Sequence, residues 1–166
     1  MKHSATLFLL ISMLLIVSTS AALGQSTSKR GKPVPKPSVD VNAEFDKAVK
    51  AGDEARIASR LDEAVQAYSQ AVRLRPKWPD GWWYLGAIYY EKDLYTQGRD
   101  AFLNLLALEP NRGQAWGLLG LCQYQTREYE PAVIAMQRAR SLGFDGNKEL
   151  ESVVRYHTAL LYVRFE

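Results

Sequence analysis

Residues 82–90 read Trp-Trp-Tyr-Leu-Gly-Ala-Ile-Tyr-Tyr, and residues 116–124, which lie 34 positions later, read Trp-Gly-Leu-Leu-Gly-Leu-Cys-Gln-Tyr. Tryptophan, leucine, glycine and tyrosine recur at matching positions in the two stretches. A fixed period of this length is typical of an array of small units, each of which buries its apolar face against its neighbours. Because such arrays present a surface, the period predicts a binding protein without naming a partner.

The period extends beyond these two stretches. Residues 34 positions apart form a column, and some columns hold small residues, others hold large side chains, and one holds the prolines that follow the second helix of a unit. The matching columns include Gly52, Gly86 and Gly120; Ala64, Gly98 and Ala132; Tyr68, Phe102 and Met136; and Pro76 and Pro110. Apolar residues recur at spacings of three and four, which indicates helices, and we see no alternating strand pattern. Each unit predicts two antiparallel helices, over 42–58 and 61–74, 79–92 and 95–108, and 113–126 and 130–142.

The glycine columns predict close packing between the two helices of each unit. A glycine inside a helix costs about 1 kcal/mol relative to alanine. Gly86 and Gly98 both fall inside predicted helices of the second unit, and Gly120 repeats the position of Gly86 in the third. We therefore expect these helices to cross where a side chain has no room.

The second unit resembles the tetratricopeptide repeat in its residues 82–90 and in Tyr95, Gly98, Phe102 and Pro110. The third unit repeats the motif with Trp116, Leu119, Gly120, Tyr129 and Ala132. The first unit departs from it at Ala48 and Ala51, and the third has Phe144 where the family usually has proline. The resemblance implies an all-α fold, an α-solenoid with a right-handed superhelix, formed by repeats 45–78, 79–112 and 113–146 within a domain of residues 41–166.

The resemblance also implies a concave groove lined by the first helix of each unit. Aromatic side chains with polar groups in its middle would bind a protein segment, and charges would lie at one end. Tyr84 and Tyr90 fit binding and packing between helices equally well. The predicted groove residues are Asp53, Arg56, Trp83, Tyr84, Ala87, Tyr90, Gln114, Leu118, Leu121 and Tyr124.

One version of this fold grips the C-terminal carboxylate of its partner with lysines and asparagines. Here the corresponding line holds Val49, Trp83 and Gly117. The sequence therefore disfavours an adaptor for chaperone tails.

The N-terminal 24 residues predict a secretory signal peptide. Lys2 precedes an apolar run over 7–17, and small residues follow, so cleavage after Ala22 or Gly24 is expected. The alternative is an uncleaved anchor, although the run is shorter than the roughly 20 residues of a membrane span. The signal predicts export, to a periplasm or the outside of the cell, with membrane contact only before cleavage.

Residues 25–40 differ in composition and predict a disordered linker rich in proline and lysine. Its basic residues leave open a weak attraction to anionic polymers or lipid headgroups. Removal of residues 1–24 takes away one lysine of 21 basic residues against 18 acidic ones, so the net charge falls from +3 to +2. A charge this close to zero gives no argument for a nucleic-acid partner.

The sequence predicts no enzyme, no cofactor and no metal site. Past the signal segment, His157 is the single histidine, and Cys122 is the single cysteine of the chain. A metal site needs several convergent ligands, and a disulfide needs two thiols. Cys122 falls in a packed column of a predicted helix, so we expect a buried, unreactive thiol.

Residues 147–166 predict one more helix, capped by Asn147 and rich in apolar residues. It either covers the third unit or leaves an apolar flank open to another chain or to further repeats. The main prediction is a non-enzymatic scaffold of the cell envelope that binds a protein segment. The alternatives are a self-associating structural module that uses this last helix, and the docking region of a larger enzyme.

Overall fold

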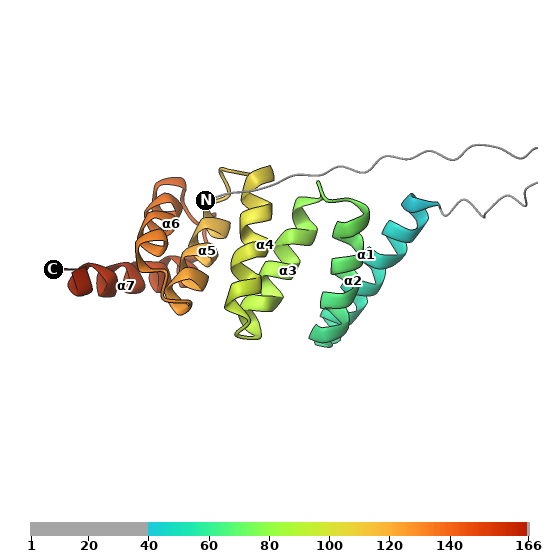
Figure 1. The fold of residues 1–166 in the computed structure, drawn as a ribbon, viewed down its shortest axis with the longest axis horizontal. Coiled ribbons are helices and arrows are strands. Elements are labelled where there is room, and N and C mark those ends of the chain that lie inside the picture. Colours follow the sequence, from blue (N-terminus) through green and yellow to red (C-terminus); the bar gives the residue numbers. More distant parts are fainter. Residues whose placement is uncertain (1–39, 166) are drawn as a thin grey trace, which may run out of the picture. The chain divides into compact units, whose positions relative to one another are not determined.

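The computed structural model describes residues 40–165, and these form seven α-helices joined by short turns (Figure 1). The predictions for residues 1–24 and 25–39 lie outside the described residues. No strand occurs within 40–165, which confirms the all-α prediction. The helices are α1 (Val41–Ile57), α2 (Leu61–Leu74), α3 (Pro79–Glu91), α4 (Tyr95–Leu108), α5 (Gly113–Gln125), α6 (Tyr129–Leu142) and α7 (Lys148–Phe165).

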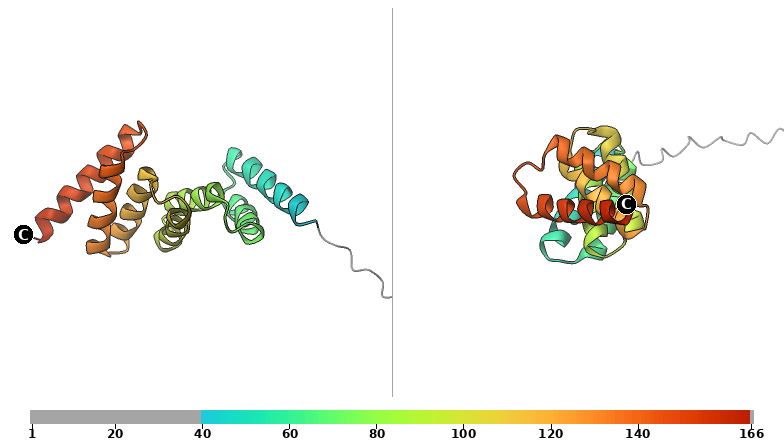
Figure 2. Two further views of the ribbon diagram at one scale, coloured as in Figure 1. Left: turned by 90° about the horizontal axis from the view of Figure 1, so that it is seen from above. Right: turned by 90° about the vertical axis from the view of Figure 1, so that its left-hand side faces the viewer.

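The first six helices form three antiparallel hairpins, α1–α2, α3–α4 and α5–α6, and the hairpins lie side by side in chain order (Figure 1, Figure 2). Each hairpin packs on the next through the contacts of α2 with α3 and of α4 with α5, and α3 also contacts α5. This is the predicted α-solenoid. Each end of these six helices lies within one residue of its predicted position.

Two of the first helices begin at residues that favour a helix start. Asp40 caps α1, since its Oδ1 accepts hydrogen bonds from the backbone N–H groups of Asn42 at 2.9 Å and Ala43 at 3.3 Å. Pro79 occupies the first turn of α3, where its missing N–H costs nothing. The second helices α2, α4 and α6 have no side-chain cap at their first turn. Their starts are therefore set by the turns that precede them.

Each hairpin turns through a residue with a left-handed backbone. Ser59, Asp93 and Arg127 have φ values of 55°, 59° and 65°, and they are 34 residues apart. In the first turn the N–H of Arg60 donates to the carbonyl of Ala55 at 2.8 Å, and the other two turns repeat this bond. This bond and the left-handed residue form the motif that commonly ends a helix. It ends the first helix of each hairpin and reverses the chain into the second.

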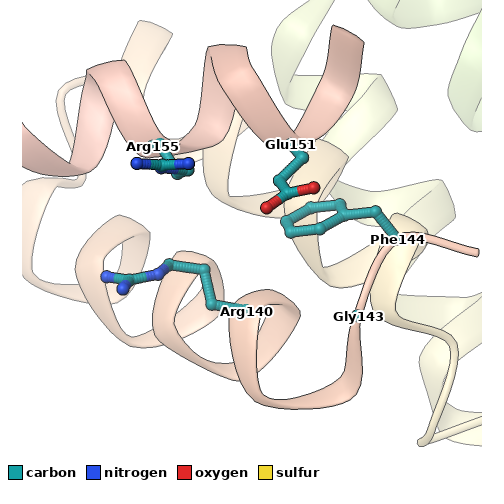
Figure 3. Close-up of a pocket in the computed structure, with 5 residues that line it drawn as sticks. All are labelled: Arg140, Gly143, Phe144, Glu151 and Arg155. Carbon is teal, nitrogen blue, oxygen red and sulfur yellow. The ribbon is translucent and has the colours of Figure 1, made fainter. Parts of the chain in front are cut away.

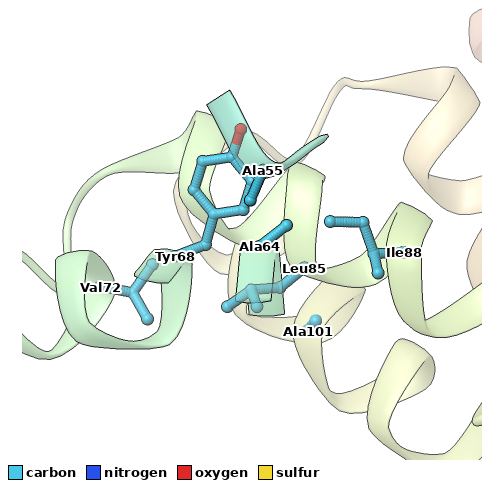
Figure 4. Packing of buried hydrophobic residues seen from close by; sticks show 7 residues of the cluster. All are labelled: Ala55, Ala64, Tyr68, Val72, Leu85, Ile88 and Ala101. Carbon is cyan, nitrogen blue, oxygen red and sulfur yellow. The ribbon is translucent and has the colours of Figure 1, made fainter. Parts of the chain in front are cut away.

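The core confirms the close packing predicted from the glycines. A Cβ atom at Gly52 would lie 2.6 Å from the Tyr68 ring, one at Gly86 2.7 Å from the Phe102 ring, and one at Gly120 2.7 Å from Met136 Cγ. Tyr68, which faces Gly52, lies among the buried side chains of α1 to α4 that Figure 4 shows. Each glycine therefore admits one large side chain from the second helix of its own hairpin.

The two tryptophans of the repeat motif close the turns between hairpins. The indole Nε1–H of Trp82 donates to the carbonyl of Pro76 at 2.8 Å, and that of Trp116 donates to the carbonyl of Pro110 at 2.8 Å. Each bond ties the first turn of one hairpin's first helix to the turn that follows the preceding hairpin. Trp82 and Trp116 therefore have a structural role.

Helix α7 covers the third hairpin with one face. It contacts both α5 and α6, and in Figure 1 it lies across the direction of the six preceding helices. Its buried side chains are Val154, Thr158 and Leu161, and Val154 packs into the space that Gly117 leaves open. The Thr158 hydroxyl donates to the carbonyl of Val154 at 2.7 Å, so it is satisfied within the core. The predicted last helix is thus present, and it acts as a cover for the third unit.

Helix α7 does not repeat the contact that joins the earlier hairpins. Val72 packs on Gly81 between the first two hairpins, and Leu106 and Ala115 share one core cluster between the next two. The residues 34 positions after Leu106 and Ala115 are Arg140 and Glu149, and both are exposed. Because charged side chains resist full burial, this interface opens and α7 takes a different angle.

Candidate functional site

An apolar pocket lies between α3, α5 and the start of α7. It has a volume of about 280 Å³, and most of its lining is hydrocarbon. Five of the predicted groove residues line it, together with four residues from the segment that begins α7. The lining residues are Trp83, Tyr90, Gln114, Leu118, Leu121, Asn147, Glu149, Leu150 and Val153.

Trp83 is held in place by contacts on both sides. Its ring meets Phe102 edge-on, with 6.0 Å between the ring centroids. The guanidinium of Arg112 lies over the same indole, 4.3 Å from its centroid, and also donates to Glu109 Oε2 at 3.0 Å. A half-buried aromatic side chain with fixed rotamers loses little entropy when a ligand packs against it.

Polar side chains at the rim are fixed by bonds to the backbone. The side-chain amide of Gln114 donates to the carbonyl of Phe144 at 3.0 Å, which ties α5 to the loop before α7. Asn147 Oδ1 accepts from the N–H of Leu150 at 3.0 Å and so caps α7, as predicted. Glu149 is exposed at the edge. The pocket thus combines an apolar floor with a polar, preorganised rim.

Tyr90 forms one side of the pocket. Its ring meets Tyr95 edge-on at 5.7 Å, and burial raises the pKa of its phenol. Tyr90 therefore stays neutral and half-buried, and it both packs and lines the pocket.

Tyr84 lies elsewhere, in the core between the first two hairpins. It stacks on Tyr68 with a centroid distance of 4.9 Å and an interplanar angle of 23°. The guanidinium of Arg56 lies 4.9 Å from its ring centroid. Tyr84 does not line the pocket, because its ring packs against Tyr68 of α2 and Arg56 of α1.

Asp53 and Arg56 form a network within α1 and α2. Arg56 Nε donates to the Tyr68 hydroxyl at 3.1 Å, and that hydroxyl donates to Asp53 Oδ1 at 2.7 Å. Burial and the bond to Asp53 raise the pKa of Tyr68 to about 12, so the phenol stays protonated. These two charged residues lie apart from the apolar pocket and hold a buried tyrosine.

Tyr124 and Ala87 also lie outside the pocket lining. Tyr124 meets His157 of α7 at 4.7 Å and Tyr129 at 5.9 Å, edge-on in both cases. Ala87 is half-buried on α3. The structure thus brings together five of the predicted residues and distributes the other five over neighbouring surfaces.

The residues contributed by the α7 segment were missing from the predicted groove. Leu150 lies 34 positions after Trp116, so the repeat itself places it at the start of one more first helix. That signal was present in the sequence. The direction of α7, which sets whether Leu150 and Val153 face the groove, was not.

A second cavity of about 340 Å³ opens where α7 departs from the repeat geometry (Figure 3). Arg140 of α6 and Arg155 of α7 line it together with Glu151, Gly143 and Phe144. Figure 3 shows two guanidinium groups and one carboxylate around it, so its lining carries charges of both signs. Its polarity comes from Arg140, which replaces an apolar residue of the earlier hairpins, and from Glu151 and Arg155 of α7.

The described residues hold no cluster of metal-binding side chains. Within 40–165 no three His, Cys, Asp or Glu side chains are placed to hold a metal ion. Cys122 is fully buried, and this burial raises the pKa of its thiol to about 12. His157 Nδ1 lies 2.8 Å from the carbonyl of Val153 in its own helix. In the same part of the chain, we find no helix with the length and hydropathy of a membrane span.

Two family models match the chain. One, described as TPR repeat, matches residues 52–93, and the other, described as Tetratricopeptide repeat, matches residues 93–145. A curated relative, the general transcriptional corepressor trfA of Dictyostelium discoideum, is 30% identical over 88 residues. That match covers 53% of this chain and 6% of the relative, so the chain corresponds to a small part of it.

Solved structures share the fold at low sequence identity. A structure of MamA has a TM-score of 0.66 at 21% identity, over 75% of this chain and 65% of that one. The first TPR domain of Spaghetti (RPAP3), bound to the HSP90 peptide SRMEEVD, has a TM-score of 0.63 at 17% identity, over 72% and 94% of the two chains. The TPR2B domain of yeast Sti1, in its complex with pHsp70, has a TM-score of 0.61 at 19% identity, over 71% of this chain and 98% of that one.

Proposed function

Because residues 52–145 carry tetratricopeptide repeats, we propose that this protein is a non-enzymatic interaction module that binds a protein segment in the pocket between α3, α5 and α7. Tetratricopeptide domains generally bind proteins, and two of the similar structures are complexes with a partner. Fold alone does not name a ligand, so the proposal depends on the pocket.

The observation that carries the proposal is an apolar pocket whose walls are already fixed. Trp83, Leu118 and Leu121 supply a hydrocarbon surface, and Gln114 and Asn147 are held by backbone bonds at its edge. Peptide-binding surfaces of this kind take one large apolar anchor and use rim groups for orientation. The ligand class that fits is an extended or helical segment with a leucine, phenylalanine or similar anchor.

The charge around the pocket narrows the partner further. Arg112 lies over the Trp83 ring and is already paired with Glu109, whereas Glu149 lines the pocket, is exposed, and forms no ion pair among the described residues. Glu149 favours a basic or neutral residue beside the anchor. A carboxylate-rich tail, such as the peptide bound by Spaghetti (RPAP3), lacks that match.

Leu118→Glu is expected to weaken segment binding at least tenfold. The change places a carboxylate in an apolar pocket, where a ligand must desolvate it. The probe is a peptide selected from a displayed random library on the wild-type chain, and the measurement is its Kd by fluorescence anisotropy. A tenfold loss corresponds to about 1.4 kcal/mol, which is modest for an interface anchor.

Leu103→Glu serves as the matched control. Leu103 is 47% exposed on α4 and does not line the pocket. This variant should bind the selected peptide as the wild type does. Equal binding by wild type and Leu118→Glu, or no peptide enriched over an empty support, contradicts the proposed site.

We further propose that the protein acts after export, in the cell envelope, and that residues 1–24 are a cleaved signal peptide. The apolar run that follows Lys2 and the small residues around Ala22 support this. N-terminal sequencing of the protein isolated from its own cells should start at Leu23 or Gln25. A chain that retains Met1 in the cytosolic fraction refutes export.

A further inference from the structure

Helix α7 carries an apolar face that nothing within residues 40–165 covers, and this face meets the pocket at Val153, which lines it. Four side chains form the face, at successive spacings of three, four and three residues along the helix. Their exposed fractions are 39% for Val153, 62% for Tyr156, 39% for Leu160 and 75% for Val163. We call these four residues the α7 stripe. Single exposed apolar residues are ordinary, but an aligned row of them is typical of an interaction surface.

Two of the four stripe positions correspond to buried residues in the hairpins, and the positions of Leu160 and Val163 correspond to half-buried ones. Leu85 and Leu119, which occupy the column of Val153, are 3% and 1% exposed. Ile88 and Cys122, in the column of Tyr156, are 3% and 0% exposed. In α3 and α5 these side chains are covered within the stacked hairpins, whereas α7 turns them outward. The first half of the stripe therefore occupies positions that pack on neighbouring helices elsewhere in the array, and Leu160 and Val163 continue it at helical spacing.

We propose that the α7 stripe pairs with the α7 stripe of a second copy of this chain, antiparallel and about a two-fold axis. The four side chains span ten positions of the helix, which corresponds to about 15 Å. Spacings of three and four residues are those of side chains at the contact between two helices that pack along each other. A two-fold interface uses the same surface on both copies, so it must be complementary to itself.

The order of residues in the stripe meets this condition. With the axis between Tyr156 and Leu160, Tyr156 of one copy packs against Leu160 of the other, and Val153 packs against Val163. Each pair then occurs twice. A large aromatic side chain meets an aliphatic one at the centre, and the smaller valines close both ends.

The charges of α7 favour the antiparallel direction. Glu149 lies on the line of the stripe, one turn before Val153, and Arg164 flanks its other end. Antiparallel pairing brings Glu149 of each copy towards Arg164 of the other. Parallel pairing would set Glu149 against Glu149, which is repulsive. Arg164 also lies over the Tyr129 ring at 4.4 Å.

The expected dimer is weak. Four side chains a copy bury less than the roughly 1,200 Å² of a stable interface. We expect a dissociation constant on the order of 100 μM, so the monomer and dimer should exchange within a concentration series from about 10 μM to about 1 mM.

Cysteine cross-linking tests both the contact and its direction. Cys122 is fully buried, so an introduced thiol is the one exposed among the described residues. Val153→Cys chains mixed with Val163→Cys chains should form at least five times more disulfide-linked dimer than either variant alone, because a disulfide needs Cα atoms about 4.4–6.8 Å apart. Two copies of residue 153 would lie about 15 Å apart along the seam. Cross-linking of Val153→Cys with itself, or no excess in the mixture, overturns the proposal.

Sedimentation of the full chain over a concentration series provides an independent measurement. The wild type should shift from monomer to dimer, and Leu160→Glu should remain a monomer. Ile134→Glu, at a site on α6 that is 65% exposed, should dimerise as the wild type does. Glu149→Arg and Arg164→Glu should each weaken the dimer about tenfold, and the double variant should restore it. A monomeric wild type, equal loss in the Ile134→Glu control, or failure of the double variant contradicts the pairing.

Discussion

Gly113→Ala is expected to lower the free energy of unfolding by about 3 kcal/mol, although it adds a single methyl group. A Cβ atom at Gly113 would lie 1.8 Å from the carbonyl oxygen of Gly143. Both partners are backbone, at the start of α5 and just after the end of α6, so no rotamer change relieves the clash. The two helices of the third hairpin must move apart, which loosens the surface that α7 covers.

Gly98→Ala is the matched control, with the same chemical change at another buried glycine. Its Cβ would lie 3.1 Å from Cys122 Sγ and 3.5 Å from the nearest backbone atoms, and the other two units have alanine in this column. The cost of this contact is offset by the gain of about 1 kcal/mol when alanine replaces glycine in a helix. Urea denaturation followed by circular dichroism compares the two variants. A Gly113→Ala protein as stable as Gly98→Ala would show that the α5–α6 contact is softer than the structure indicates.

The hairpins were predictable because the residues that determine their packing and their ends recur in the sequence every 34 positions. Gly86 and Phe102 form a pair of one small and one large residue, and the same pair recurs in the units before and after. Pro79 marks a helix start, and Pro76 marks the end of the helix before it. Such signals are local, so they survive in a single sequence without an alignment.

The hairpin turns carried no such signal. A left-handed residue at the end of a helix is usually glycine, but here it is Ser59, Asp93 and Arg127. These three side chains share no chemistry. The turn is set by tertiary packing of the helices on both sides, which overrides the local preference of each residue.

Only part of the candidate site was predicted, because the sequence does not show which face of each helix is turned towards the pocket. Trp83 and Tyr84 are neighbours on α3, yet Trp83 lines the pocket and Tyr84 stacks on Tyr68. Column matching places both on the first helix of a unit but does not give the angle at which adjacent hairpins meet. The same limit applies to Val153 of α7, whose column is buried in α3 and α5.

Phe102→Ala is expected to lower the free energy of unfolding by about 4 kcal/mol. Phe102 is fully buried between α3, α4 and α5, and it meets the edge of Trp83 in the pocket wall. Truncation leaves a cavity that the rigid helices around it cannot close. Leu103→Ala on the same helix removes a side chain that is 47% exposed, and it should cost less than about 1 kcal/mol. Thermal and urea unfolding of the two variants measure the difference.

The effect of Gly86→Ala on the free energy of unfolding should have opposite signs in the wild type and in the Phe102→Ala variant. This comparison tests the pairing of a small residue with a large one. In the wild type its Cβ would lie 2.7 Å from the Phe102 ring, and a buried ring has nowhere to move, so we expect destabilisation of about 2 kcal/mol. In the Phe102→Ala background the ring is gone, and alanine should stabilise the helix by up to about 1 kcal/mol. The coupling energy in the double-mutant cycle would then be about 3 kcal/mol. Additive effects would mean that Gly86 is retained for a reason other than Phe102, and the explanation of the glycine column in all three units would fail with it.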